Sequence, residues 1–130
     1  MRLSNLKGMY LLNRYLCHGA LLFLVAALPA LAAQSGLATW YGESHRGKPM
    51  ANTKPFDPDA YTCASWYYPL GTVLVVKSGT LYTVVTVTDR GPNKRLIKKD
   101  GRVIDLSRAA FKQLAPLRVG KTKVEIEILK

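Results

Sequence analysis

The sequence predicts an all-β domain with one short helix, and three observations support this fold class. Runs rich in β-branched and aromatic residues are short, and glycine, proline and polar residues interrupt them at close intervals. Residues 123–128 alternate strictly between polar and apolar side chains, which is typical of a strand with one buried face. Signals for the start and the end of a helix enclose only one segment, at about 107–115.

The first predicted strand is 37–41, and Gly42 ends it. The polar stretch 43–61 is rich in proline and glycine, so we expect one long loop at the rim of the fold. Two β-rich runs follow at 72–77 and 81–88. Because Ser78-Gly79 between them has the composition of a tight turn, these runs are expected to form a hairpin.

The last third of the chain carries the helix and the final strand. Ser107 has the side chain of an N-cap for a helix over 108–115, which Pro116 then stops. In the alternating segment that follows, Val124, Ile126 and Ile128 are expected to share the buried face.

Residues 1–32 are predicted to be a signal peptide, which leaves 33–130 as the folded domain. A basic start precedes a short apolar core at 20–28, and Ala30-Leu31-Ala32 then forms an A-x-A cleavage site. The apolar core is too short for a good membrane span, although a retained N-terminal anchor is the alternative. We therefore expect cleavage after Ala32, export to the periplasm or the extracellular cell-wall space, and no stable membrane anchor.

The charge of the domain indicates an anionic partner. Three of the 19 Lys and Arg residues and none of the 8 acidic residues lie in 1–32, so the rest of the chain carries 16 against 8, a net charge of +8. A basic run at 94–102 is usually a solvated loop, but its sign suits an anionic wall polymer. Nucleic acid is not expected as a partner, because the chain has an export signal and no recognised binding motif. A monomer is expected.

Cysteine and histidine chemistry is sparse outside 1–32. Cys63 has no second cysteine there, so no internal disulfide is expected, and its apolar surroundings predict a buried thiol rather than a nucleophile. Cys17 lacks the small residues of a lipidation site. His45 has no partner at metal-binding spacing, so neither a metal nor a cofactor is expected. A domain of roughly 98 residues without such staples must build its own core, which a closed β-barrel can provide.

The strongest candidate for a functional group is Asp89. It stands where an apolar strand ends, at the turn Asp89-Arg90-Gly91-Pro92. A carboxylate at such a strand end points to the rim of a sheet or barrel, where clefts form. The alternative is that Asp89 only binds the amides of its own turn.

Several segments of the chain together resemble the rare lipoprotein A (RlpA) family. In chain order these are Gly36-Leu37-Ala38-Thr39-Trp40-Tyr41-Gly42, Ala51-Asn52, Phe56-Asp57, Thr62-Cys63-Ala64, Pro69-Leu70-Gly71-Thr72, Asp89-Arg90-Gly91-Pro92 and Ile104-Asp105-Leu106-Ser107. The resemblance implies a six-stranded double-psi β-barrel, related to expansins. It also implies an endolytic lytic transglycosylase, a lyase that cuts the glycan strands of peptidoglycan to 1,6-anhydromuramoyl ends.

The resemblance also implies site residues. Active members of the family carry a loop Glu, a His and the Asp of the Asp-Arg-Gly-Pro run, and these positions fall on Lys54, Ser65 and Asp89 here. Asp89 is therefore the expected catalytic residue, with Lys54 and Ser65 at auxiliary positions. Because two of the three differ, a non-catalytic, expansin-like wall-binding module is the alternative function. A basic exported protein or inhibitor that acts on another polyanion or protein is a third class.

One carboxyl group suffices for transglycosylation, because it can donate a proton to the glycosidic oxygen and later accept one from the muramoyl 6-hydroxyl. Such an acid must hold its proton near neutral pH, whereas a cation at Lys54 would favour an ionised carboxylate. Glu43 is a candidate substitute acid, and its alternative is an exposed loop carboxylate.

The remaining site candidates are aromatic and basic. Tyr41 and Trp66 are expected to stack on sugar rings, because aromatic faces suit the apolar faces of sugars. Arg90 is expected to contact substrate. Asp105 is expected to brace the turn or Arg90 rather than to act in catalysis.

Overall fold

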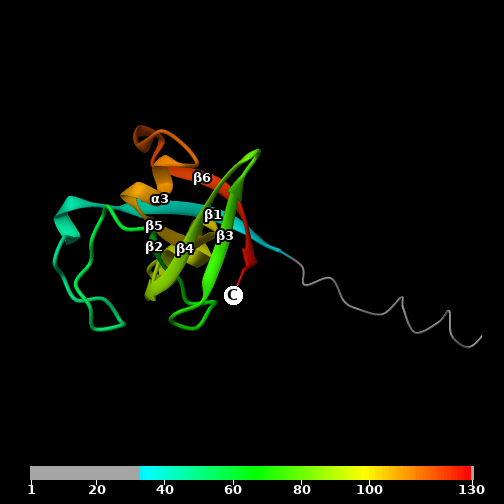
Figure 1. Ribbon diagram of the computed structural model, residues 1–130. Coiled ribbons are helices and arrows are strands. Elements are labelled where there is room, and N and C mark those ends of the chain that lie inside the picture. Colours follow the sequence, from blue (N-terminus) through cyan, green and yellow to red (C-terminus); the bar gives the residue numbers. More distant parts are fainter. Residues whose placement is uncertain (1–32, 130) are drawn as a thin grey trace, which may run out of the picture. The chain divides into compact units, whose positions relative to one another are not determined.

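The computed structural model of the protein describes residues 33–129, which form a closed six-stranded barrel (Figure 1). The predicted signal peptide and its cleavage site lie outside the described residues. The strands are β1 (Gln34–Tyr41), β2 (Thr62–Ala64), β3 (Val73–Ser78), β4 (Leu81–Asp89), β5 (Arg102–Ser107) and β6 (Lys121–Ile128). The helices are η2 (Glu43–His45), α2 (Lys94–Asp100), α3 (Arg108–Lys112) and η3 (Leu117–Val119).

The barrel mixes parallel and antiparallel pairs. Around it the order is β1-β5-β2-β4-β3-β6, and β6 closes onto β1. The pairs β1–β5 and β2–β4 are parallel, whereas the other four are antiparallel. The parallel strands β1 and β5 approach each other closely at Gly36. A Cβ at this position would lie only 2.5 Å from a Val103 methyl, so a larger residue would not fit without a shift. The predicted all-β class is confirmed.

The hairpin and the rim loop are also confirmed. Strands β3 and β4 pair from Val73↔Thr86 to Ser78↔Leu81, and Gly79 in their turn has a φ of +61°. The loop 43–61 contains no strand longer than the isolated bridge Pro49↔Pro55. It extends from one side of the barrel, opposite the start of β1 (Figure 1).

The helices differ in part from the prediction. Ser107 caps α3 as expected, since its side chain accepts from the Ala110 amide, but the α-helix ends at Lys112 rather than at 115. The helix α2 was not predicted, because its apolar spacing is weak. The signals for it were local: the Asn93 side chain accepts from the Arg95 amide at the start, and Gly101 is left-handed at the end.

One hydrophobic core fills the barrel and includes Ala110 and Phe111 of α3. Its largest fully buried side chains include those of Phe111, Leu74, Ile104, Leu106 and Ile126. The predicted alternation in β6 holds for Val124 and Ile126. It is wrong for Ile128, which is 58% exposed, because β6 ends there and the side chain lies beyond the packed core.

Cys63 is free and fully buried, and burial raises the pKa of its thiol to about 12. The thiol therefore stays protonated and packs as a small apolar group, as predicted. The part of the chain that the structure describes contains no helix long and apolar enough to span a membrane.

Candidate functional site

Asp89 ends β4 and holds the tip of the rim loop against the barrel. Its Oδ1 accepts hydrogen bonds from the amides of Ala51, at 2.9 Å, and Arg90, at 2.8 Å. The Asn52 amide adds a bond to the Thr88 carbonyl at 3.1 Å. Asp89 therefore does bind turn amides, but with one oxygen, and no hydrogen bond within residues 33–129 reaches its Oδ2.

A register shift decides where the Asp89 side chain points. In the β2–β4 pair Cys63 lies opposite Val87, and the next residue, Ala64, lies opposite Asp89, so β4 carries one extra residue at Thr88. Simple alternation from Val87 would turn Asp89 into the core. The bulge instead places it on the side of Ala64, because an extra residue re-aims the side chains that follow.

The same Ala64 also pairs with Asp105 of β5. Asp89 and Asp105 thus flank one residue from neighbouring strands. A Cβ on Gly91 would lie 3.1 Å from the Asp105 Oδ2 and 3.4 Å from the Ala64 Cβ, so the carboxyl of Asp105 lies against the turn that follows Asp89. A side chain at this position would be in tight contact with the Asp105 carboxyl, which would have to shift slightly to accept it.

Asp105 occupies an environment that favours its neutral form. Burial is the main cause that raises the pKa of this carboxyl. A hydrogen bond from the Thr39 hydroxyl and the charges of Arg102 and His45 lower it, and the charge of Asp89 adds the smallest contribution, which raises it. A carboxyl between the fully buried Ile104 and Leu106 was a signal in the sequence, because buried carboxyls are rare without a role or a partner. The sequence pattern predicted only a bracing role for Asp105.

The expected contact between Asp105 and Arg90 is wrong. The Arg90 guanidinium turns the other way, and its Nη1 donates to the carbonyls of Ser65, at 2.8 Å, and Tyr68, at 2.7 Å. The Asp105 carboxyl lies beside Gly91 of the turn, but its hydrogen bond within residues 33–129 comes from the Thr39 hydroxyl of β1 rather than from the turn.

Tyr41 brings a hydroxyl, rather than a free ring face, to the two carboxyls. Its ring stacks on Phe56 with centroids 4.2 Å apart and meets His45 edge-on at 5.6 Å. The hydroxyl is buried and has no hydrogen-bond partner among the described residues. Burial raises the pKa of Tyr41 well above its ordinary value, with further contributions from the charges of Asp89 and Asp105, so this hydroxyl is a neutral donor.

The two auxiliary positions differ in burial and in their contacts. Lys54 is exposed at the tip of the rim loop, where its amide binds the Asn52 side chain at 3.0 Å, and its ammonium forms no ion pair within 33–129. Ser65 is fully buried, and its amide donates to the Asp89 carbonyl at 3.1 Å. Its hydroxyl is 3.5 Å from the Val103 carbonyl and accepts from the Tyr67 amide at 3.2 Å, so this side chain supports the site from beneath.

Trp66 presents an aromatic surface beside the same turn. Its indole N–H donates to the Pro92 carbonyl at 2.8 Å, and its side chain remains 44% exposed. The Lys94 ammonium lies 4.6 Å from the centre of its ring. The ring is therefore held in place with a cation on one face, and it is the aromatic group of the site best placed to meet a sugar.

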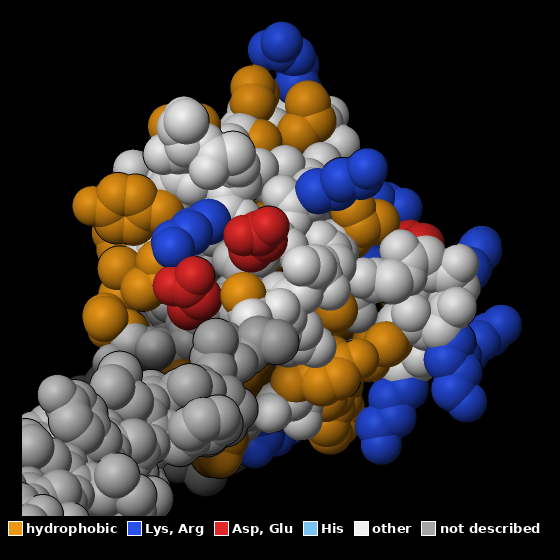
Figure 2. All heavy atoms as spheres, turned by 90° about the vertical axis from the view of Figure 1, so that its right-hand side faces the viewer, with side chains coloured by type: hydrophobic (Ala, Val, Ile, Leu, Met, Phe, Trp, Pro, Cys, Tyr) orange, Lys and Arg blue, Asp and Glu red, His pale blue; other side chains and the backbone are white. Residues whose placement is uncertain are grey.

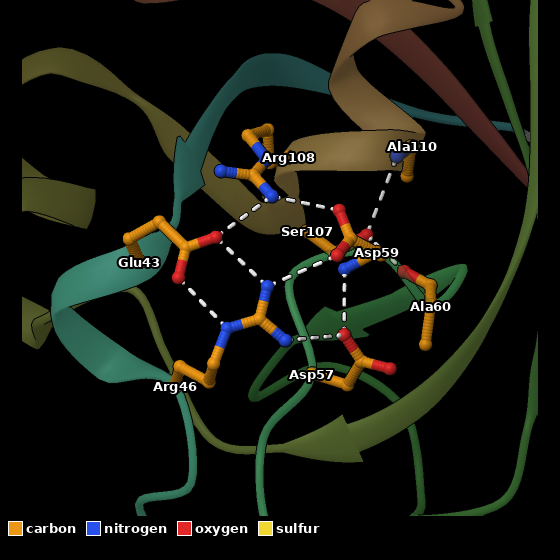
Figure 3. A network of polar contacts seen from close by, with 8 residues as sticks. All are labelled: Glu43, Arg46, Asp57, Asp59, Ala60, Ser107, Arg108 and Ala110. Atoms are coloured by element: carbon orange, nitrogen blue, oxygen red, sulfur yellow. Dashed lines mark hydrogen bonds and ion pairs between the residues drawn. The ribbon is translucent and has the colours of Figure 1, made fainter.

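Glu43 belongs to an ion-pair network that includes Arg46, Asp57, Asp59 and Arg108 (Figure 3). Its carboxylate binds Arg46 at 2.7 Å and Arg108 at 2.9 Å. The hydrogen bond from Arg46 is the main cause that lowers the pKa of Glu43 to about 2. A carboxylate that ionises so readily is unsuited to donate a proton, so the geometry does not favour Glu43 as a substitute acid.

The network fastens both ends of the rim loop to the start of α3. Arg46 also reaches Asp59 at 3.0 Å, and Arg108 reaches the same carboxylate at 2.7 Å. The backbone adds a bond from the Ala109 amide to the Pro58 carbonyl at 3.0 Å. Through the loop this network holds Tyr41, Phe56 and the turn that binds Asp89.

The two carboxyls do not line either of the cavities described below. Cavities of about 510 and 500 Å³ occur on the domain, but neither Asp89 nor Asp105 lines them. On the face in Figure 2, acidic side chains lie beside a basic one near the middle, and other basic side chains lie toward the outline. The basic side chains visible on this face do not form one continuous patch.

Comparisons with known proteins show the family and the fold of this chain. A family model described as lytic transglycolase matches residues 33–126. The probable endolytic peptidoglycan transglycosylase RlpA of Aquifex aeolicus is 38% identical over 97 residues, which are 73% of this chain and 41% of that protein. The endolytic peptidoglycan transglycosylase RlpA of Yersinia pestis is 40% identical over 99 residues, 75% of this chain and 26% of that protein. The chain thus spans less than half the length of these relatives.

Two solved structures share the fold. The Streptomyces papain inhibitor superposes with a TM-score of 0.61 and 25% identity, covering 80% of this chain and all of the inhibitor. An apo expansin of Clavibacter michiganensis superposes with a TM-score of 0.58 and 23% identity, covering 75% of this chain and 50% of the expansin.

Proposed function

The chain belongs to the lytic transglycolase family of double-psi β-barrels, and from this premise we propose that it is an exported endolytic lytic transglycosylase. Its substrate would be the glycan strands of peptidoglycan, and its products would end in 1,6-anhydromuramoyl groups. The relatives named above carry this activity in their names, and the signal-peptide pattern in residues 1–32 supports export to the wall space.

The observation that carries the proposal is the meeting of Asp89 and Asp105 at Ala64. One carboxyl stands at the turn with an oxygen that accepts no hydrogen bond within residues 33–129. The other is buried, and burial is the main cause that raises the pKa of this carboxyl. Two carboxyls in unlike environments are the usual arrangement for acid–base chemistry on a glycosidic bond.

The proposed reaction needs one proton carrier, and Asp89 fills that role. Protonated Asp89 gives its proton to the glycosidic oxygen as the bond from that oxygen to the muramoyl anomeric carbon breaks. The muramoyl 6-hydroxyl then bonds to the anomeric carbon and returns its proton to Asp89, so no water is consumed. Burial of Asp105 raises the pKa of that carboxyl, which weakens the tendency of the pair to carry a second negative charge. Trp66 would hold a sugar ring next to the turn.

The alternative is a wall-binding module without catalysis, and the residues at two family positions favour it. Lys54 replaces the Glu that active relatives carry, and Ser65, which replaces their His, is buried and bonded to the backbone. In this case the same surface would bind glycan strands and leave them intact.

One assay separates the two functions. Purified protein is incubated with peptidoglycan glycan strands, and the products are analysed by mass spectrometry for 1,6-anhydromuramoyl ends. Such ends from the wild type support the enzyme. If only the Lys54→Glu variant makes them, the chain is a binding module built on a disabled enzyme, because the substitution removes a cation and restores the carboxylate. Their absence from both, with glycan still bound, also identifies the binding module.

A further inference from the structure

A second cavity lies along the first half of β4, away from Asp89. It measures about 500 Å³, and its walls include Tyr61, Tyr82, Thr83 and Gln113. Asp89 lies six positions after Thr83 on the same strand, which is about 20 Å at the rise of a β-strand. The cavity has the volume of an ordinary small-molecule site, and it is separate from the carboxyl pair.

Exposed aromatic and aliphatic side chains gather at this cavity. Tyr82 is 64% exposed and Tyr61 is 49% exposed, and Leu81 and Val84 beside them are also exposed. Large apolar side chains that cluster on a surface mark a binding site more often than those that occur singly. None of the residues that line the cavity is charged, in a chain of net charge +11.

A buried hydroxyl in the wall of the cavity has no partner. Thr83 is only 3% exposed, and its Oγ1 makes no hydrogen bond within the described part of the chain. A buried hydroxyl without a partner costs stability and needs an explanation, and a bound ligand that supplies the missing bond is one.

We propose that this cavity is a second saccharide-binding site, which takes a neutral sugar unit of the glycan strand. The faces of two tyrosine rings suit the apolar faces of sugars, and the Thr83 hydroxyl and the Gln113 amide suit their hydroxyls and acetamido groups. The absence of charge favours a sugar over the carboxylates of a stem peptide, which a basic chain would otherwise meet with lysine or arginine. A long glycan strand can contact Asp89 and this cavity together, about 20 Å apart.

That the sugar comes from peptidoglycan rests on the proposed function, whereas the cavity does not depend on catalysis. The probes are therefore peptide-free glycan strands and a neutral oligomer of N-acetylglucosamine, and binding is measured by calorimetry. Tyr82→Ala and Tyr61→Ala should each weaken binding roughly tenfold, the effect of losing one good aromatic contact. Tyr82→Phe keeps the ring and should bind as the wild type does. Val119→Ala, at another exposed apolar residue that lines neither cavity, is the matched control.

Thr83→Val gives an independent readout. Removal of a buried hydroxyl without a partner should raise the melting temperature of the free protein, and the same change should weaken saccharide binding. A mere packing role would move only the melting temperature. If both tyrosine-to-alanine variants bind as tightly as the wild type, or if the wild type binds neither probe, the inference is wrong. If the protein cleaves glycan strands but neither tyrosine substitution weakens saccharide binding, the second site is refuted and the proposed enzyme is not. If the tyrosine substitutions weaken saccharide binding but the protein cleaves nothing, only the proposed enzymatic activity is refuted.

Discussion

Asp89 and Asp105 pair with the same residue, Ala64, from its two sides. They come from strands that are 16 residues apart at these positions, and β2 lies between them in the barrel. The relationship depends on the bulge at Thr88, which brings Asp89 to the side of β4 on which Ala64 and Asp105 lie. The bulge therefore brings two carboxyls to the same side of the barrel wall, and one of them, Asp105, is buried.

Asp89→Asn should abolish most of the cleavage and leave glycan binding nearly unchanged. The amide keeps the shape and accepts the same two amide hydrogen bonds, but it cannot carry a proton. Loss of an acid–base group costs about 10²–10⁴-fold in rate. The measurement is the yield of anhydro products over time, with Glu125→Gln, an exposed carboxylate on β6, as the control. Cleavage by Asp89→Asn at the wild-type rate would show that Asp89 is only a turn residue.

Asp105→Asn should stabilise the protein more at higher pH. The pKa of Asp105 is raised in the folded state, so the native protein binds this proton more tightly than the unfolded chain does. Its contribution to stability is fully present below about pH 4, the ordinary range for Asp, and is lost as the pH rises through the folded pKa. Asparagine has no such loss. The difference in melting temperature between variant and wild type should therefore grow from pH 4 to pH 8, and a difference that shrinks would contradict the assignment.

Arg46→Gln should loosen the rim loop in a salt-dependent way. Arg46 binds the carboxylates of Glu43 and Asp59, and without it these two groups share only Arg108. Because the pairs are exposed, the loss in melting temperature should be small and should nearly vanish at 1 M salt, where screening removes it. Lys77→Gln, which breaks an exposed pair with Glu127 away from the loop, is the control. If the two variants have equal effects on glycan cleavage, the network does not position the site.

Ile126→Asp should unfold the domain, whereas Ile128→Asp should not. Ile126 is buried in the core, and Ile128 two residues later is exposed. A buried charge without a partner costs several kcal/mol, a large part of the roughly 5–15 kcal/mol by which a domain is stable. Circular dichroism and thermal unfolding of both variants check the expectation. An Ile126→Asp protein with the wild-type melting temperature would place β6 outside the barrel core.

The sequence by itself determined the features that depend on near neighbours. The alternation at 123–128 predicted β6, Ser78-Gly79 predicted the hairpin, and Ser107 predicted the start of α3, because each pattern reports the local backbone. Asp89 at a strand end before a Gly-Pro turn could also be selected without a structure. The segments that resemble a known family added the barrel and its chemistry.

Only the tertiary structure decided what surrounds Asp89. The bulge that turns Asp89 outward arises where β2 pairs with β4, and the residue pattern within β4 does not predict this bulge. Arg90 donates to two carbonyls 22 and 25 positions earlier in the chain, and Glu43 binds Arg108, which is distant in sequence, as well as its near neighbour Arg46. Asp105 entered the site because Ala64 pairs with residues 25 and 41 positions further along the chain. Pairing over such distances depends on closure of the whole barrel, which a local pattern cannot specify.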